Sequence, residues 1–156
     1  MADTAPTTRQ HSPLAQAADR LAAATRSSGG AVRLAGLPFL TQVNVRLDAK
    51  SPAADAMGLA LGLQLPPQPD TVVRAGNRTV LWLGPHEWLV AGPSGIERDL
   101  EGRIRAAAGD EPVSVTDVCA QTTPARTQVV LVAREETRAG FRVLVRSSFA
   151  GYLADW

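Results

Sequence analysis

Two tight-turn signals between three short apolar runs, all within residues 71–91, limit the fold of this chain more than any other feature. The first two runs are TVVRA and RTVLWLG, and the Gly76-Asn77 pair between them is typical of a two-residue hairpin turn. A second turn at Gly84-Pro85 ends that strand, and a third strand is expected at 88–91. Strands joined by so few residues lie side by side in antiparallel order. The sequence therefore predicts a mostly antiparallel sheet.

Further strands are indicated by alternation of apolar and polar residues or by short apolar runs. Residues 39–47 alternate, with Val43, Val45 and Leu47 on one side and polar side chains on the other, as in a half-buried strand. The remaining segments expected to be extended are 32–37, 112–118, 127–134 and 141–146, of which the last two are joined by the turn sequence EETRAG.

Helical signals occur between these strands. Ser51 and Pro52 are suited to the N-cap and the first position of a helix, and Ile96, Leu100 and Ile104 form an apolar stripe at four-residue spacing. The expected helices are 14–26, 52–63, 96–108 and 147–156. Hairpins mixed with helices predict an α+β fold, a mostly antiparallel sheet with packed helices. We expect a disordered tail over residues 1–13 and a single α+β domain over residues 14–156.

Charge and cysteine content exclude several classes of function. The net charge is only +1, without the basic stripe of a nucleic-acid-binding protein or the polybasic segment of a membrane anchor. The single cysteine, Cys119, cannot form a disulfide within the chain, and the N-terminus has no apolar signal segment. We therefore expect a cytoplasmic protein that binds neither nucleic acid nor membranes.

No motif for a catalytic, cofactor or metal site is found in the sequence. Its two histidines, His11 and His86, lie far apart, so there is no zinc-type spacing of ligands. Glycine-rich nucleotide-binding motifs and a serine nucleophile elbow are also missing. We expect this chain to hold no cofactor and no metal and to have no catalytic site of its own.

The stretch LWLGPHEWLV, residues 81–90, is interpreted as a structural turn. A histidine beside a carboxylate invites a catalytic interpretation, but acid–base chemistry needs a second positioned group that the sequence does not offer. Gly84 and Pro85 are expected to make the turn, and Glu87 to accept hydrogen bonds from backbone N–H groups. Trp82 and Trp88 are expected to anchor it by burying large apolar surfaces.

Several stretches together resemble the gamma subunit of heterotetrameric sarcosine oxidase. They cover most of the chain from about residue 34 to the end. The most specific are the phrase L-W-L-G-P-x-E-W-L and the ending F-R-x-L-V-R-x-S-F-x-x-Y-L-x-D-W; the others are LPFLTQVNVRLD, VSVTDV and CAQTTPARTQVVLVA.

The resemblance implies a role as a non-catalytic subunit beside alpha, beta and delta subunits. It implies a fold related to that of the folate-binding aminomethyltransferases. The complex demethylates sarcosine oxidatively to glycine and makes hydrogen peroxide, with formaldehyde or methylene-tetrahydrofolate as the one-carbon product. FAD, FMN, NAD and tetrahydrofolate are implied for the partner subunits. Two alternatives stay open, a free-standing folate-binding or aminomethyltransferase-like domain and a degenerate remnant.

Two features depart from the family pattern. His86 stands where the family usually has an aspartate, and Val118 runs directly into Cys119 where the family has a longer middle segment. An internal deletion near 118–119 would remove a strand and a helix and would leave apolar surface and a sheet edge uncovered. We expect the isolated chain to be poorly soluble or loosely packed.

The C-terminal helix is the predicted contact with partner subunits. Its aromatic side chains follow helical spacing, and two arginines on the preceding strand could supply contacts at the rim. The alternative is that the aromatic side chains pack on the sheet. The candidates are Arg142, Arg146, Phe149, Tyr152 and Trp156.

Overall fold

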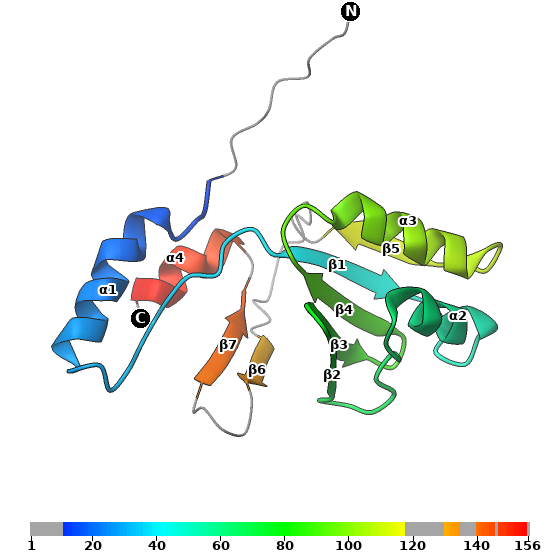
Figure 1. The fold of residues 1–156 in the computed structure, drawn as a ribbon, viewed down its shortest axis with the longest axis horizontal. Helices are drawn as coiled ribbons and strands as arrows, with labels where there is room; N and C mark the ends of the chain where they lie inside the picture. The colour runs from blue at the N-terminus through cyan, green and yellow to red at the C-terminus, as the bar shows by residue number, and fades with distance from the viewer. Residues whose placement is uncertain (1–10, 118–129, 135–139, 146, 156) are drawn as a thin grey trace, which may run out of the picture. The chain divides into compact units, whose positions relative to one another are not determined.

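The alternating segment after residue 39 forms strand β1 (Thr41–Arg46), which lies inside a five-stranded antiparallel sheet of order β2-β3-β4-β1-β5 (Figure 1). The computed structural model describes residues 11–117, 130–134, 140–145 and 147–155. Strands β2 (Val72–Ala75), β3 (Arg78–Gly84) and β4 (Glu87–Gly92) form the predicted hairpins, and β5 (Ser114–Asp117) is paired with β1. The predicted α+β fold with an antiparallel sheet is confirmed.

Gly76 makes the first hairpin turn possible because its φ is +56°, in the left-handed region that favours glycine. The register across the two hairpins pairs Val80 with both Val73 and Val90, and it pairs Trp82 with Trp88. Side chains paired in this way project from the same face of the sheet.

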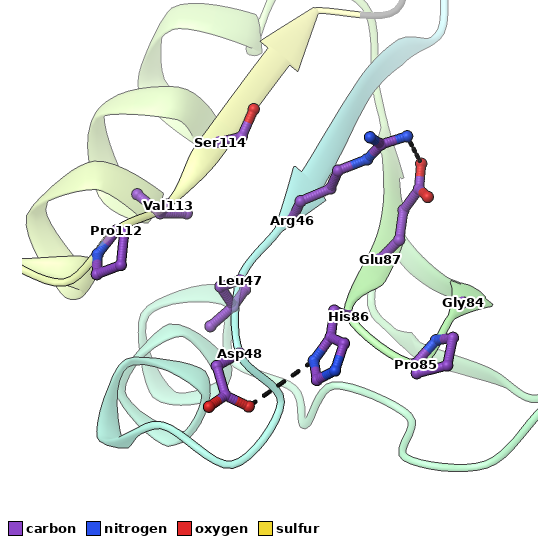
Figure 2. A pocket seen from close by; sticks show the side chains of 10 residues that line it. All are labelled: Arg46, Leu47, Asp48, Gly84, Pro85, His86, Glu87, Pro112, Val113 and Ser114. Atoms are coloured by element: carbon purple, nitrogen blue, oxygen red, sulfur yellow. Dashed lines mark hydrogen bonds and ion pairs between the residues drawn. The ribbon is translucent and has the colours of Figure 1, made fainter.

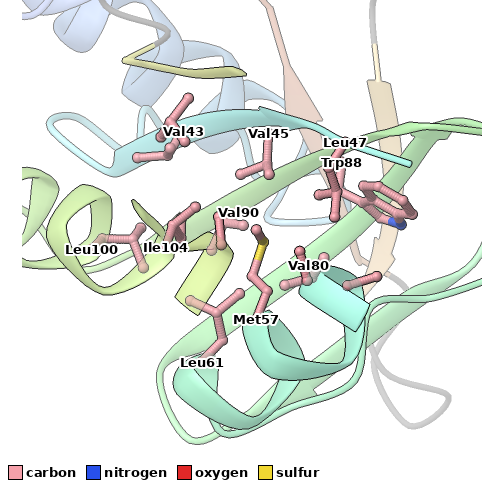
Figure 3. Packing of buried hydrophobic residues seen from close by; sticks show 14 of the residues in the cluster. Val43, Val45, Leu47, Met57, Leu61, Val80, Trp88, Val90, Leu100 and Ile104 are labelled. Carbon is pink, nitrogen blue, oxygen red and sulfur yellow. The ribbon is translucent and has the colours of Figure 1, made fainter. Parts of the chain in front are cut away.

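Helices α2 (Pro52–Leu61) and α3 (Glu97–Ala108) pack on that face (Figure 3). Ser51 takes the N-cap position of α2 and Pro52 the first position, as predicted, and Gly62 ends the helix in a left-handed conformation. The fully or almost fully buried residues between helices and sheet are Val43, Val45, Met57, Leu61, Val80, Trp88, Val90, Leu100 and Ile104. This cluster is the hydrophobic core of the sheet and its two helices.

The chain divides into two compact units, whereas the sequence analysis expects one domain over residues 14–156. Unit 2 is Leu40–Ala125 and holds the five-stranded sheet with its own core. Unit 1 is made of Met1–Phe39 and Arg126–Trp156. The single domain stays a prediction, and each unit is described separately.

The described part of unit 1 contains helices α1 and α4, a short 3-10 helix and a two-stranded sheet. Helix α1 (Ala18–Ser27) follows a 3-10 turn (Ala15–Ala17), and α4 (Ser147–Asp155) ends the described chain. Arg20 of α1 forms an ion pair with Asp155 of α4. Strands β6 (Val130–Arg134) and β7 (Gly140–Leu144) form an antiparallel pair, as predicted.

The strand predicted at 32–37 is wrong. The segment is irregular and exposed, and its backbone N–H groups at Val32 and Leu34 donate to the hydroxyls of Ser28 and Thr25 at the end of α1. A strand is stabilised by the packing of its side chains, and the apolar side chains of this segment are exposed to solvent. The next predicted strand is confirmed but begins later, at Thr41, because Phe39 has a φ of +60°.

Two further predictions fall on parts of the chain that the structure does not describe. Residues 1–10 of the expected tail lie outside the described residues, as does the junction at 118–119. On either side of that junction, β5 belongs to the five-stranded sheet and β6 to the two-stranded one.

Candidate functional site

The turn between β3 and β4 brings together the residues that the sequence singled out. Gly84 and Glu87 face each other across the turn, and the strand register shifts between Trp82 and Gly84, as at a β-bulge. The backbone N–H of Leu47, just beyond β1, donates to the carbonyl oxygen of His86 at 3.2 Å. The turn is therefore attached to the end of β1 through the backbone.

The two tryptophans lie opposite each other where β3 and β4 converge. Trp88 is only 2% exposed, and its indole N–H donates to the carbonyl oxygen of Pro66 at 2.9 Å. Trp82 is half-buried and packs against the core cluster. The indole ring of Trp88 therefore connects the turn to the proline-rich loop before β2.

Glu87 accepts hydrogen bonds from side chains of β1, not from the backbone N–H groups that the sequence analysis expects. Its Oε1 atom accepts from the amide nitrogen of Asn44 at 2.7 Å and from Nη2 of Arg46 at 3.0 Å. Arg46 lies directly opposite Glu87 in the register of the two strands. Strand pairing with β1 supplied these donors, and no local motif could have revealed them.

Removing the Glu87 carboxylate should destabilise the fold. Asn44 is 8% exposed, so Glu87→Ala leaves a largely buried amide without its acceptor, a loss of about 1–3 kcal/mol. The matched variant Arg46→Ala removes the other donor, whose side chain is 61% exposed, and should lose only about 0–1 kcal/mol. Urea unfolding of both variants measures the difference; equal losses would contradict the buried role of the Asn44–Glu87 bond.

An open surface hollow of about 880 Å³ lies beside this turn (Figure 2). The imidazole Nδ1 of His86 is 3.7 Å from Oδ1 of Asp48, and both side chains are largely exposed. The described residues contain no group of three or more His, Cys, Asp or Glu side chains that could hold a metal ion. The hollow is lined by Arg46, Leu47, Asp48, Gly84, Pro85, His86, Glu87, Pro112, Val113 and Ser114.

A second, partly buried polar cluster lies at the N-terminus of α3, and no sequence motif predicted it. Oε1 of Glu97 accepts from the hydroxyl of Thr41 at 3.0 Å and from the backbone N–H of Gly95 at 3.2 Å. Thr41 is fully buried, and its oxygen accepts from the backbone N–H of Ile96. The pKa of Glu97 is lowered, above all by its own backbone N–H and also by Thr41 and Gly95, against the opposing effect of burial.

This cluster predicts a specific dependence of stability on pH. Because the pKa of Glu97 in the folded state lies below its ordinary value of 4.5, the ionised carboxylate stabilises the fold above that value. The contribution is lost as the pH falls through the lowered pKa. Glu97→Gln should therefore unfold about 1 kcal/mol more easily at pH 7, and this difference from the parent should shrink as the pH falls through the lowered pKa of Glu97.

Urea unfolding at several pH values measures this effect. Glu101→Gln on the same helix is the matched control and should show no such convergence. A loss at Glu97→Gln that stays constant from pH 7 to pH 3 would contradict the role of the ionised carboxylate.

The predicted partner-contact residues of α4 are placed in part. Phe149 is 40% and Tyr152 69% exposed, while Ala150 of the same helix is buried. Arg142 is paired with Val132 between β7 and β6, but its side chain, Arg146 and Trp156 lie outside the described residues. In the described part of the chain, no helix has both the length and the apolar character needed to cross a membrane.

Comparisons with known proteins identify a family, related sequences and a related structure. The profile of the sarcosine oxidase gamma subunit family matches residues 46–126, which include the β3–β4 turn. A sarcosine oxidase subunit gamma from an Arthrobacter species is 41% identical over 115 residues, 73% of this chain and 55% of that protein. Its counterpart from Corynebacterium sp. (strain P-1) is 42% identical over 100 residues, 64% of this chain and 48% of that protein.

The solved structures give a matching result. One chain of the heterotetrameric sarcosine oxidase from Corynebacterium sp. U-96, in complex with pyrrole 2-carboxylate, superposes with a TM-score of 0.73 at 25% identity. The match covers 94% of this chain and 92% of that chain. The molecule is thus an α+β protein of the kind found in a multi-subunit oxidase. It belongs to the sarcosine oxidase gamma subunit family, and it spans about half the length of the curated relatives it matches.

Proposed function

We propose that this chain is the non-catalytic gamma subunit of a heterotetrameric sarcosine oxidase. The observation that carries the proposal is the structural match, over 94% of the chain, to a chain of a heterotetrameric sarcosine oxidase. Identity of 41% to a gamma subunit supports the same role. The free-standing folate-binding domain and the degenerate remnant have no comparable observation in their favour.

Within this proposal the chemistry takes place on the partner subunits. The complex would demethylate sarcosine oxidatively to glycine, with hydrogen peroxide and either formaldehyde or methylene-tetrahydrofolate as further products. FAD, FMN, NAD and tetrahydrofolate would be bound by the alpha, beta and delta subunits in the cytoplasm. Calorimetry of the isolated chain with tetrahydrofolate tests this division: saturable binding would contradict it and favour the folate-binding alternative.

We further propose that the exposed face of α4 contacts a partner subunit. Phe149, Tyr152 and Leu153 follow at the spacing of one helical face, and they are 40%, 69% and 37% exposed. Large apolar side chains that stay exposed together on a helix are typical of an interaction surface. Tyrosine is also one of the residues that most often dominate binding energy.

The composition of unit 1 supports the same assignment. Eight of the nine large apolar side chains described as exposed lie in unit 1; the exception is Leu59 of α2. The described buried apolar residues of unit 1 are only Ala17, Leu21 and Ala150. Exposed apolar side chains of this kind gain stability when a partner covers them.

We also propose that the junction at 118–119 marks an internal shortening relative to the family. The support is the length of the curated relatives, together with β5 at the edge of the five-stranded sheet. An edge strand is a place where a further strand can be added. Resequencing the gene across this junction tests the proposal; an intervening coding segment would show that the shortening is an error in the gene sequence.

The test of the main proposal is assembly. A tagged copy of this chain, co-expressed with the alpha, beta and delta subunits, should retain all of them on an affinity column. Capture of none of them would contradict the proposed role.

A further inference from the structure

His86 connects the β3–β4 turn to the segment that follows β1, and that connection selects one tautomer of its neutral ring. The backbone N–H of Ala49 donates to Nδ1 of the imidazole at 3.2 Å. A ring nitrogen that accepts a hydrogen bond carries no proton, so the neutral ring holds its proton on Nε2. The bond from Ala49 therefore exists only while His86 is uncharged.

The carboxylate of Asp48 lies close enough to pair with a protonated His86 ring. Oδ1 of Asp48 is 3.7 Å from the same Nδ1 atom (Figure 2). This oxygen is fixed by the backbone N–H of Lys50 at 3.0 Å, and the carbonyl oxygen of Asp48 accepts from the hydroxyl of Ser51 at 2.8 Å. The carboxylate is thus oriented before the imidazole is protonated.

Of the charged side chains that line the hollow, Asp48 is the one paired with the His86 ring. Arg46 and Glu87, on the same side, are paired with each other at 3.0 Å. The opposite wall, residues 112–114, contributes only uncharged side chains. Asp48 is therefore the carboxylate within reach of the His86 ring.

We propose that His86 is a pH-dependent latch, in which the neutral ring binds the N–H of Ala49 and the protonated ring releases it and pairs with Asp48. The latch holds two loops that line the hollow, the β3–β4 turn and the connection from β1 to α2. The backbone bond from Leu47 to the carbonyl of His86 stays in place, so the turn remains attached while the side chain changes partner.

Nuclear magnetic resonance of the full chain tests the latch. The nitrogen shifts of the His86 ring should show the Nε2–H form at high pH. The amide resonance of Ala49 and the carboxyl carbon of Asp48 should move together with the titration of the His86 ring. Exchange of the Ala49 amide with solvent, corrected for its intrinsic pH dependence, should become about tenfold faster when the ring is protonated.

Two variants separate the latch from a general effect of acid. His86→Asn keeps an acceptor oxygen near the position of Nδ1 but does not titrate, so the Ala49 amide should stay protected at every pH. His11→Asn removes the other histidine and should leave the Ala49 response unchanged. An Nδ1–H ring at high pH, an Ala49 amide that ignores the titration, or the same response in His86→Asn would each overturn the proposal.

Discussion

Replacing Trp88 with alanine is expected to lower the free energy of unfolding by about 3–5 kcal/mol, the largest loss we predict for a single change in this chain. The side chain is 2% exposed and is among the largest fully buried groups of the core. Its removal leaves a cavity in the hydrophobic core, and it also leaves the carbonyl oxygen of Pro66 without its 2.9 Å hydrogen bond. Both effects act in the same direction.

Urea unfolding followed by far-ultraviolet circular dichroism measures the loss without depending on tryptophan fluorescence. Trp82→Ala is the matched control, because Trp82 lies opposite Trp88 in the same hairpin but is only half-buried. Its loss should be clearly smaller. Equal losses at the two positions would show that the turn is not anchored mainly by the buried indole.

Replacing Tyr152 with aspartate is expected to weaken assembly with the partner subunits by about 30-fold or more, the effect of losing one dominant interface residue. The side chain is 69% exposed in the chain alone, so a charge there should not disturb the fold. In the proposed complex the same charge would be buried against apolar surface, which is strongly unfavourable. Affinity is measured by titrating the chain against the remaining subunits.

Leu59 provides the control for this experiment. It is an apolar side chain on helix α2 that is 84% exposed, and Leu59→Asp introduces the same charge at a comparable site in unit 2. This variant should assemble normally. Loss of assembly with Leu59→Asp and not with Tyr152→Asp would move the partner contact from α4 to α2.

The parts of the fold that depend on local signals could be predicted from the sequence. The turn at Gly76-Asn77, the alternation that becomes β1 and the stripe of Leu100 and Ile104 each reflect preferences of neighbouring residues. The pairing of β2 with β3 and of β3 with β4 could also be predicted, because strands joined by short connections usually lie next to each other in the sheet. The same reasoning identified the β3–β4 turn and its two tryptophans.

The parts that depend on distant residues could not be predicted in this way. Residues 32–37 are predicted to be extended from their apolar side chains, but they form no strand. Composition alone does not show whether a second strand is available for pairing. The donors of Glu87 come from β1, and the hydroxyl that binds Glu97 lies on Thr41, more than fifty residues earlier in the chain. The register of β1 with β4 brings the donors to Glu87, and the packing of α3 beside β1 brings Glu97 to Thr41.

Assembly is the most direct test of the proposed role. The full chain, carrying an affinity tag, is co-expressed with the alpha, beta and delta subunits, and the captured material is separated by size. We predict a single species that contains the tagged chain and all of its partners and oxidises sarcosine. Elution of the tagged chain alone, while the other subunits form a complex without it, would contradict the account.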